Sequence, residues 1–206
     1  MKVRIKVKIN YNEVLKKTIS SLDHKPTLLL HSCCGPCSTE VIDVLKDNFL
    51  ITVLYYNPNI EPESEYLKRK EEQIRFLKMV NIPLLDIGYN NFEFKRIAKG
   101  LEKEKEGKKR CVLCIHNRLS KTKEMALAHK FEYFGTTLTV SPHKNSQIIN
   151  NLGRALADDN VKFLFSDFKK ENGYLKSVLF AKKYNLYRQN YCGCLYAKDN
   201  NLPDDF

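Results

Sequence analysis

The residues of this sequence best suited to chemistry are its cysteines, of which there are seven. They form three clusters, which are Cys33, Cys34 and Cys37, then Cys111 and Cys114, then Cys192 and Cys194. Thiolates are strong ligands for zinc and for iron–sulfur clusters. An odd number of cysteines cannot all pair as disulfides within one chain. The clusters therefore predict a metal site.

The two downstream pairs have the spacing of metal ligands. Cys111 and Cys114 open a predicted helix, whose first-turn amide groups favour thiolate charge, and Gly193 between Cys192 and Cys194 lets the backbone wrap closely around a metal. Four thiolates suit a structural zinc and a [4Fe–4S] cluster equally well. A lone zinc would leave the three upstream thiols without a role. The full set therefore favours a [4Fe–4S] cluster with either a second metal or a reactive thiol.

The cysteines also have simpler interpretations. The upstream three, at 33–37, could be small buried apolar residues, but three in five positions at a strand end is unusual for a core. For Cys111 and Cys114 a plain zinc clip stays open. A thioredoxin-type dithiol is disfavoured, because Cys111 follows a basic run rather than a strand.

The upstream cysteines lie where an apolar strand at 27–31 ends and a helix begins at Pro36. In an open α/β sheet this is the carboxyl edge, where ligands bind. Further strands are expected at 50–56, 83–87, 133–139 and 161–165, and helices at 11–22, 36–48, 64–80, from 92 to the charge run at 102–110, 111–130, 145–157 and 174–184. The alternation predicts a single α/β domain over 1–206, a parallel sheet with helices on both faces.

Three details complete this expected organisation. Residues 1–22 form an N-terminal extension in which 3–9 alternate like a half-buried strand, and 185–206 form a cysteine-bearing C-terminal tail. The helix at 64–80 is expected to bury one apolar stripe. Its members are Leu67, Ile74, Leu77 and Met79.

Composition limits the class of protein and its partners. The chain has 206 residues, of which 43% are hydrophobic, enough for one domain with a substantial core. It lacks an apolar run of membrane-spanning length and a secretory signal, so we expect a cytoplasmic protein with reduced thiols. The net charge of +11 indicates either a polyanionic partner, nucleic acid first, or a lysine-rich solvated surface.

Polar residues near the cysteine clusters are candidates for substrate binding. Tyr187, Arg188 and Tyr191 precede the last cysteine pair and could stack on a base and pair with a phosphate. His143 and Lys144 lie between a predicted strand end and a helix start, a position suited to anions. Packing of the tail, and simple capping of the helix at 145–157, are the alternatives.

Together these motifs resemble the cobalamin-independent epoxyqueuosine reductase family, QueH. The matching segments are 29–37 (LLHSCCGPC), 56–60 (YNPNI), 111–114 (CVLC), 136–145 (TTLTVSPHKN), 167–170 (DFKK) and 187–194 (YRQNYCGC). They cover the chain in order from about residue 27 to 196, and the combination is highly specific.

The resemblance implies reduction of epoxyqueuosine to queuosine at the wobble position of tRNA. It implies a [4Fe–4S] cluster with an adjacent second metal, iron, held by cysteines and an aspartate, and a one-electron donor of the ferredoxin or flavodoxin kind. The implied fold is that of PP-loop and other adenine-nucleotide α-hydrolase-like proteins, with the cysteine loop replacing the phosphate-binding loop. Removing the epoxide oxygen to leave an alkene takes two electrons and two protons.

On this basis we divide the ligands. Cys111, Cys114 and the pair at 192–194 are placed nearest the cluster, whereas Asp167 and two loop thiols, Cys33 and Cys37, hold the second metal and act in catalysis. An exchange of one loop thiol with one tail thiol is the alternative. Asp86 is the competing carboxylate.

Two other classes remain open, a PP-loop-type tRNA sulfur transferase, whose glycine-rich loop is absent, and a non-catalytic zinc-ribbon module. The lysine-rich segments 95–110 and 169–183 are expected to hold the tRNA backbone.

Overall fold

The computed structural model describes residues 8–198, and its centre is a five-stranded parallel sheet of order β3-β2-β1-β4-β5. The strands are β1 (Thr27–His31), β2 (Leu50–Tyr55), β3 (Leu84–Asp86), β4 (Tyr133–Thr136) and β5 (Lys162–Phe163). The central strand β1 is an apolar run with helices on both sides, as expected of a parallel sheet covered on each face.

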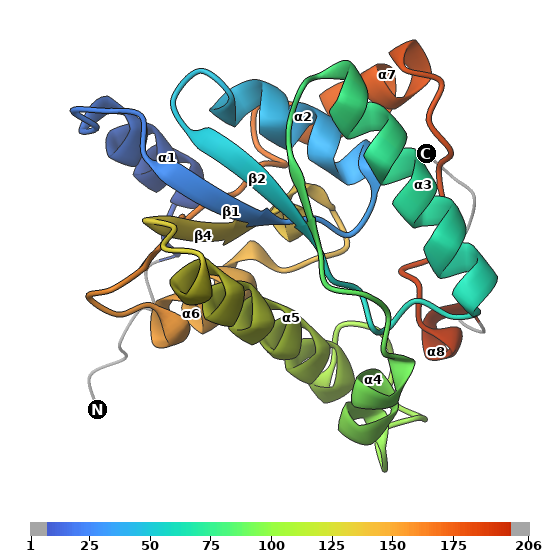
Figure 1. Ribbon diagram of the computed structural model, residues 1–206. Helices are drawn as coiled ribbons and strands as arrows, with labels where there is room; N and C mark the ends of the chain where they lie inside the picture. Colours follow the sequence, from blue (N-terminus) through green and yellow to red (C-terminus); the bar gives the residue numbers. More distant parts are fainter. Residues whose placement is uncertain (1–7, 199–206) are drawn as a thin grey trace, which may run out of the picture.

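Helices cover both faces of this sheet (Figure 1). They are α1 (Tyr11–Ser20), α2 (Gly35–Leu45), α3 (Glu63–Met79), α4 (Asn91–Ala98), α5 (Lys109–Ala128), α6 (Ser146–Leu156), α7 (Gly173–Lys183) and α8 (Leu195–Lys198). In Figure 1, α2, α3 and α7 lie on one side of the sheet, and α5 and α6 lie on the other. The predicted fold class is confirmed. Among the described residues, no helix is both long enough and apolar enough to cross a membrane.

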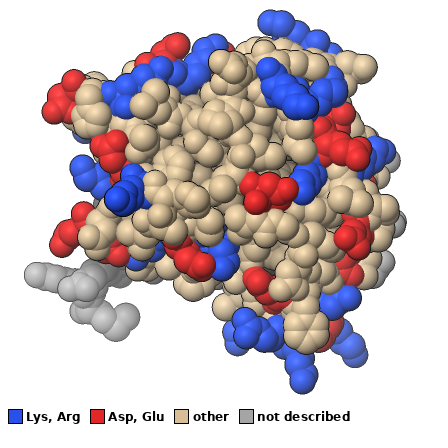
Figure 2. Space-filling model, in the orientation of Figure 1, with Lys and Arg blue, Asp and Glu red and all other residues tan. Residues whose placement is uncertain are grey.

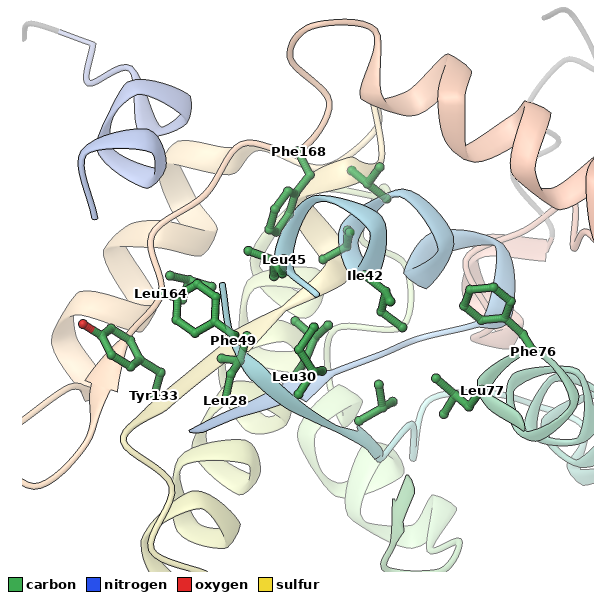
Figure 3. Packing of buried hydrophobic residues seen from close by; sticks show 14 of the residues in the cluster. Leu28, Leu30, Ile42, Leu45, Phe49, Phe76, Leu77, Tyr133, Leu164 and Phe168 are labelled. Carbon is green, nitrogen blue, oxygen red and sulfur yellow. The ribbon is translucent and has the colours of Figure 1, made fainter. Parts of the chain in front are cut away.

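Two apolar clusters hold the layers together. The first lies between the sheet and α2, α3 and α7, where Leu28 and Leu30 of β1 meet Ile42 and Leu45 of α2 (Figure 3). The second lies beneath α5 and α6 and contains Leu29, which points to the opposite face from its neighbours in β1. Alternate residues of one strand therefore supply both cores.

The strand order reverses direction between β1 and β4, since the chain first builds β2 and β3 on one side and then crosses to β4 and β5. This is the topological switch point of an open parallel sheet, and ligands bind beyond the carboxyl ends of the strands there. The loop carrying Cys33 and Cys34 leaves β1 at this point. The fold thus places the upstream thiols at its natural binding crevice.

Several sequence predictions are corrected by the structure. Half of the apolar stripe assigned to α3 is wrong, because Leu67 and Met79 are exposed, whereas Leu77 is buried as predicted and Ile74 is half-buried. The buried face of the helix also contains two polar residues, Arg69 and Gln73. These two polar side chains hold the thiol loop and the tail, as described below. The predicted strand at 133–139 is shorter, because it turns into a 3-10 helix at Thr137–Val140. The strand expected at 3–9 lies largely outside the described residues.

The correction to α3 is testable by comparing two leucines of that helix. Leu77 is 2% exposed within the first core cluster, whereas Leu67 is 46% exposed. Leu77→Ala leaves a cavity and is expected to lower the free energy of unfolding by about 2–5 kcal/mol. Leu67→Ala should change it by no more than about 0.5 kcal/mol. Urea unfolding followed by circular dichroism measures both, and equal losses would restore the predicted stripe.

Candidate metal centre

Hydrogen bonds fix the end of β1 and the first residue of the loop that follows it. His31 is fully buried, and its ring nitrogens contact the Thr136 hydroxyl at 3.0 Å and the Tyr56 carbonyl at 3.1 Å. Burial lowers the pKa of His31 to about 4, so the ring is neutral at pH 7. The Asn57 amide donates to the carbonyl of Ser32 at 2.9 Å. These contacts fix the direction in which the chain enters the thiol loop.

A buried amide of α3 braces the other side of the loop. Gln73 accepts a hydrogen bond from Ser32 at 2.7 Å and donates to Ser38 at 3.0 Å. Pro36, in the first turn of α2, lacks the backbone N–H that would have no partner there. The turn between strand and helix is consequently tight, and the thiols on either side of it converge.

The three loop thiols form a compact group. One ligand atom from each of Cys33, Cys34 and Cys37 lies within 4.8 Å of the others, and the first two sulfurs are 3.8 Å apart. A tetrahedral site with metal–sulfur bonds of about 2.3 Å separates its sulfurs by about 3.8 Å. No other three potential ligands among residues 8–198 are grouped so closely. The loop therefore has the spacing of a single metal ion.

The pKa values of these three thiols diverge because the sulfurs share hydrogen bonds. The pKa of Cys33 is held well below its usual value by hydrogen bonds from its two partners, with help from the Arg118 charge. Burial raises the pKa of Cys34 to about 12, and the pKa of Cys37 is also raised, chiefly by its hydrogen bonds to the other two. Burial and these hydrogen bonds therefore oppose thiolate charge at Cys34 and Cys37. A bound cation would stabilise both as thiolates.

The other four cysteines surround a neighbouring cavity of about 90 Å³. They are Cys111 and Cys114 from the first turns of α5, and Cys192 and Cys194 from the tail. The backbone N–H of Gly107 donates to the Cys111 sulfur at 3.2 Å. These sulfurs are spread around a space instead of meeting at one point. That arrangement fits a group larger than one ion, such as an iron–sulfur cluster.

Burial opposes charge on most of these four thiols. It raises the pKa of Cys194 to about 12 and also raises the pKa values of Cys111 and Cys114. The positive charge of Lys144 acts in the opposite direction on the pKa values of Cys111 and Cys114, and its Nζ donates to the Cys192 sulfur at 3.2 Å. Buried thiols of high pKa lose their protons readily only when a metal ion binds to the sulfur. The chemistry of the donor set thus fits a metal-bound state.

The C-terminal tail is held at the cavity by hydrogen bonds from α3 and by the backbone conformation of Gly193. Arg69 donates to the carbonyls of Tyr191 and Cys192, both at 3.3 Å. Gly193 has φ +128°, and a Cβ there would lie 2.9 Å from Cγ1 of Ile60. Only glycine satisfies both the backbone conformation and the close approach. The Cys-Gly-Cys spacing is therefore a packing requirement.

The two thiol groups border two cavities that share a wall. A second cavity of about 250 Å³ is lined by Cys33 and Cys37. Five residues line both cavities, namely Glu106, Arg118, His143, Lys144 and Cys192. A group bound by the downstream cysteines and a molecule entering the second cavity would share this wall.

Four of the five predicted substrate-binding residues line the second cavity, namely His143, Lys144, Arg188 and Tyr191. Tyr191 donates its hydroxyl to the Glu61 carbonyl at 2.7 Å, and the Arg69 guanidinium lies 4.9 Å from its ring centroid. Their role toward a substrate stays a prediction.

Tyr187 lies apart from both cavities. Its hydroxyl donates to the Glu65 carboxylate at 3.1 Å, and Lys68 lies 3.6 Å from the centroid of its ring. Its structural contacts thus brace the tail against α3.

The predicted carboxylate ligands have other partners in this structure. Asp167 is buried, accepts a hydrogen bond from Ser146 at 2.9 Å and pairs with Lys169 at 2.6 Å, and it lines neither cavity. Asp86 pairs with Lys70 at 2.5 Å. A ligand role for Asp167 therefore stays a prediction, and it would require its oxygens to leave these partners.

Three site residues escaped the sequence analysis. Gln189 donates to the Cys34 sulfur at 2.9 Å, and Glu106 and Arg118 belong to the shared wall. Arg118 had a detectable signal, because positions 111, 114 and 118 follow the i, i+3, i+7 spacing of one helix face. Glu106 lay within a charge run and carried no such pattern.

Comparison with known proteins now connects this centre to a family. A family model described as epoxyqueuosine reductase QueH matches residues 28–200. The chain belongs to the QueH family. It is 43% identical to the epoxyqueuosine reductase QueH of Staphylococcus epidermidis over 202 residues, covering 92% of this chain and 85% of the relative. The QueH of Thermotoga maritima is 37% identical over 178 residues, covering 83% and 90%. The sequence-based resemblance is thereby confirmed.

A solved structure places the QueH fold in a wider group. The U34-tRNA thiolase NcsA from Methanococcus maripaludis, solved with its [4Fe–4S] cluster, is similar with a TM-score of 0.58 and 14% identity. The match covers 91% of this chain and 67% of the thiolase. At this identity the likeness concerns the fold alone. It is the α/β arrangement described above.

The glycine of the tail provides a test of how the centre is closed. Gly193→Ala should lower the iron content of the purified protein and its unfolding free energy by about 1–3 kcal/mol, because of the clash with Ile60 and the unfavourable φ. Gly100→Ala is the matched control, since that residue also has positive φ but nothing lies within 4 Å of the added Cβ. Iron analysis and urea unfolding measure both variants. If Gly193→Ala kept as much iron as Gly100→Ala, the tail glycine would not be needed to close the metal centre.

Proposed function

We propose that this protein is an epoxyqueuosine reductase, which removes the epoxide oxygen of epoxyqueuosine in tRNA to give queuosine. Membership of the QueH family, with relatives of that name over most of their length, carries this conclusion. Six of the seven thiols line two cavities that share a wall, and the seventh, that of Cys34, lies 3.8 Å from the Cys33 sulfur; this grouping supports the proposal. The reaction consumes two electrons and two protons and yields an alkene and water.

The residues around the second cavity are assigned to binding of the modified base. The second cavity opens beside Cys33 and Cys37 and is bordered by the polar side chains of Arg188 and Tyr191, so it is where the modified base enters. An aromatic face there can stack on a base extruded from the anticodon loop. His143 and Lys144 on the shared wall lie where they can bind the oxygen side of the base. Epoxyqueuosine is thus held between the two thiol groups.

We further propose a division of metals between the thiols. The four cysteines around the 90 Å³ cavity hold a [4Fe–4S] cluster, and the compact group of Cys33, Cys34 and Cys37, with Asp167 as a further ligand, holds a single iron. The 3.8 Å sulfur spacing in the loop supports the mononuclear assignment. When bound, the metals supply single electrons and a Lewis acid for the epoxide oxygen.

Metal analysis tests this division. Anaerobically purified protein should contain about four irons with acid-labile sulfide and about one further metal. Cys111→Ala and Cys194→Ala should abolish the absorption near about 400 nm, because each removes a cluster ligand. Cys33→Ala should keep most of that absorption and lose about one equivalent of metal.

Two outcomes would contradict the division. Equal loss of absorption in Cys33→Ala and Cys111→Ala would show that one centre uses both groups of thiols. Zinc without sulfide in the wild-type protein would end the iron–sulfur assignment altogether and favour a structural zinc module.

The tRNA is proposed to bind through basic surface segments. Around α4 and the loop that follows it, the exposed cations are Lys95, Arg96, Lys99, Lys103, Lys105, Lys108 and Lys109. Figure 2 shows blue side chains gathered at the lower end of the molecule, where Figure 1 places α4. The second segment, 169–183, includes α7, which contributes Tyr174 and Ser177 to the lining of the second cavity, and its exposed lysines are Lys170, Lys176, Lys182 and Lys183. We propose the cytoplasm as the location and a ferredoxin- or flavodoxin-like protein as the electron donor.

Salt dependence tests the tRNA assignment. The double charge reversal of Lys103 and Lys105 to Glu should weaken binding of both modified and unmodified tRNA, and lower the slope of log Kd against log salt by about one for each phosphate that is no longer neutralised. Lys17→Glu on α1, an exposed lysine at the opposite end of the molecule, is the control and should leave the slope unchanged. Tyr191→Ala should instead reduce turnover more than affinity. Binding that is independent of salt would argue against a tRNA substrate.

A further inference from the structure

Arg118 is a buried cation that has no carboxylate partner among the described residues. Its side chain extends from α5 and is 2% exposed. In the part of the chain that the structure describes, no carboxylate lies within salt-bridge distance of it, and its side-chain hydrogen bond to the Cys114 carbonyl is long at 3.4 Å. The buried Arg69, by contrast, pairs with Glu65 at 2.6 Å. A buried charge without a counter-ion is costly, so an anion is expected beside it.

The surroundings of Arg118 identify that anion. Burial alone would lower the pKa of its guanidinium, yet interactions with Cys114, Cys192, Cys33 and Cys111 hold it above the usual value. These cysteines belong to both thiol groups, and Arg118 lines both cavities. Metal-bound thiolates would be the negative charges nearest to it.

We propose that Arg118 is a positioning residue of the metal centre, the permanent counter-charge between the two thiol groups, and that it raises the reduction potential of the bound cluster. This inference rests on the proposed function, since it presumes an iron–sulfur cluster. The guanidinium remains positive at every physiological pH, so its effect does not depend on titration. A residue of this kind acts on the reaction through the metals and need not touch the substrate.

The direction of the effect follows from charge. Reduction adds one electron to a centre that is already anionic, and a nearby fixed cation stabilises the reduced form more than the oxidised form. Removing the cation therefore makes the potential more negative. The enzyme gains a cluster that a physiological donor can reduce, with its charge balanced away from water.

The test is a redox titration, followed by electron paramagnetic resonance, of anaerobically purified, cluster-loaded protein. Arg118→Met should shift the midpoint potential of the cluster by at least about 59 mV to more negative values, a tenfold change in a one-electron equilibrium constant. Arg118→Lys keeps the charge and should remain closer to the wild-type potential than Arg118→Met. Arg154→Met, which removes an exposed arginine of α6 that lines neither cavity, should leave the potential unchanged.

Urea unfolding of the metal-free proteins separates this role from a structural one. Metal-free Arg118→Met should be at least as stable as metal-free wild type, because the change removes a buried charge that lacks its anion. Loss of the cluster with unchanged metal-free stability would also support the proposal. An unchanged potential in a variant that keeps its cluster, or a large loss of metal-free stability, would overturn it. Wild-type protein without sulfide would instead overturn the proposed function, before any variant is compared.

Discussion

Thiols can be buried together as metal ligands only where positive charge and hydrogen-bond donors are buried with them. The structure meets this requirement from every side of the centre. Lys144 donates to Cys192, Gln189 donates to Cys34, and Arg118 lies between the two thiol groups. Each donor comes from a different part of the chain, so the centre forms only when the whole domain is folded. Binding of metal and stability of the fold are therefore coupled.

The parallel sheet provides the place where these elements meet. Because the strand order reverses between β1 and β4, the loops that follow these two strands diverge and leave a crevice at their carboxyl ends. The U34-tRNA thiolase NcsA has a similar fold. Here the crevice is bordered by a cysteine loop, and the tail closes over it. Function is thus placed on a common scaffold by local loop chemistry.

The α3 helix explains why polar residues occupy a position that would ordinarily be apolar core. Its buried face carries Gln73, which braces the thiol loop, and Arg69, which holds the tail. The helix thereby links the first and last cysteine clusters, which are separated by about 155 residues of chain. Ordering the tail costs conformational entropy, and these contacts offset that cost.

The sequence by itself determined the chemistry and the class of fold. Cysteine spacing at 33–37, 111–114 and 192–194 reports local geometry, and the alternation of apolar strands with helices reports a parallel sheet, because both patterns depend on neighbours along the chain. Only the tertiary structure decided that Glu106, Arg118 and Gln189 join the site, and that Tyr187 and Asp167 lie outside both cavities. Those features depend on contacts between segments far apart in sequence. Packing of complete helices against the sheet sets such contacts, and no local periodicity encodes them.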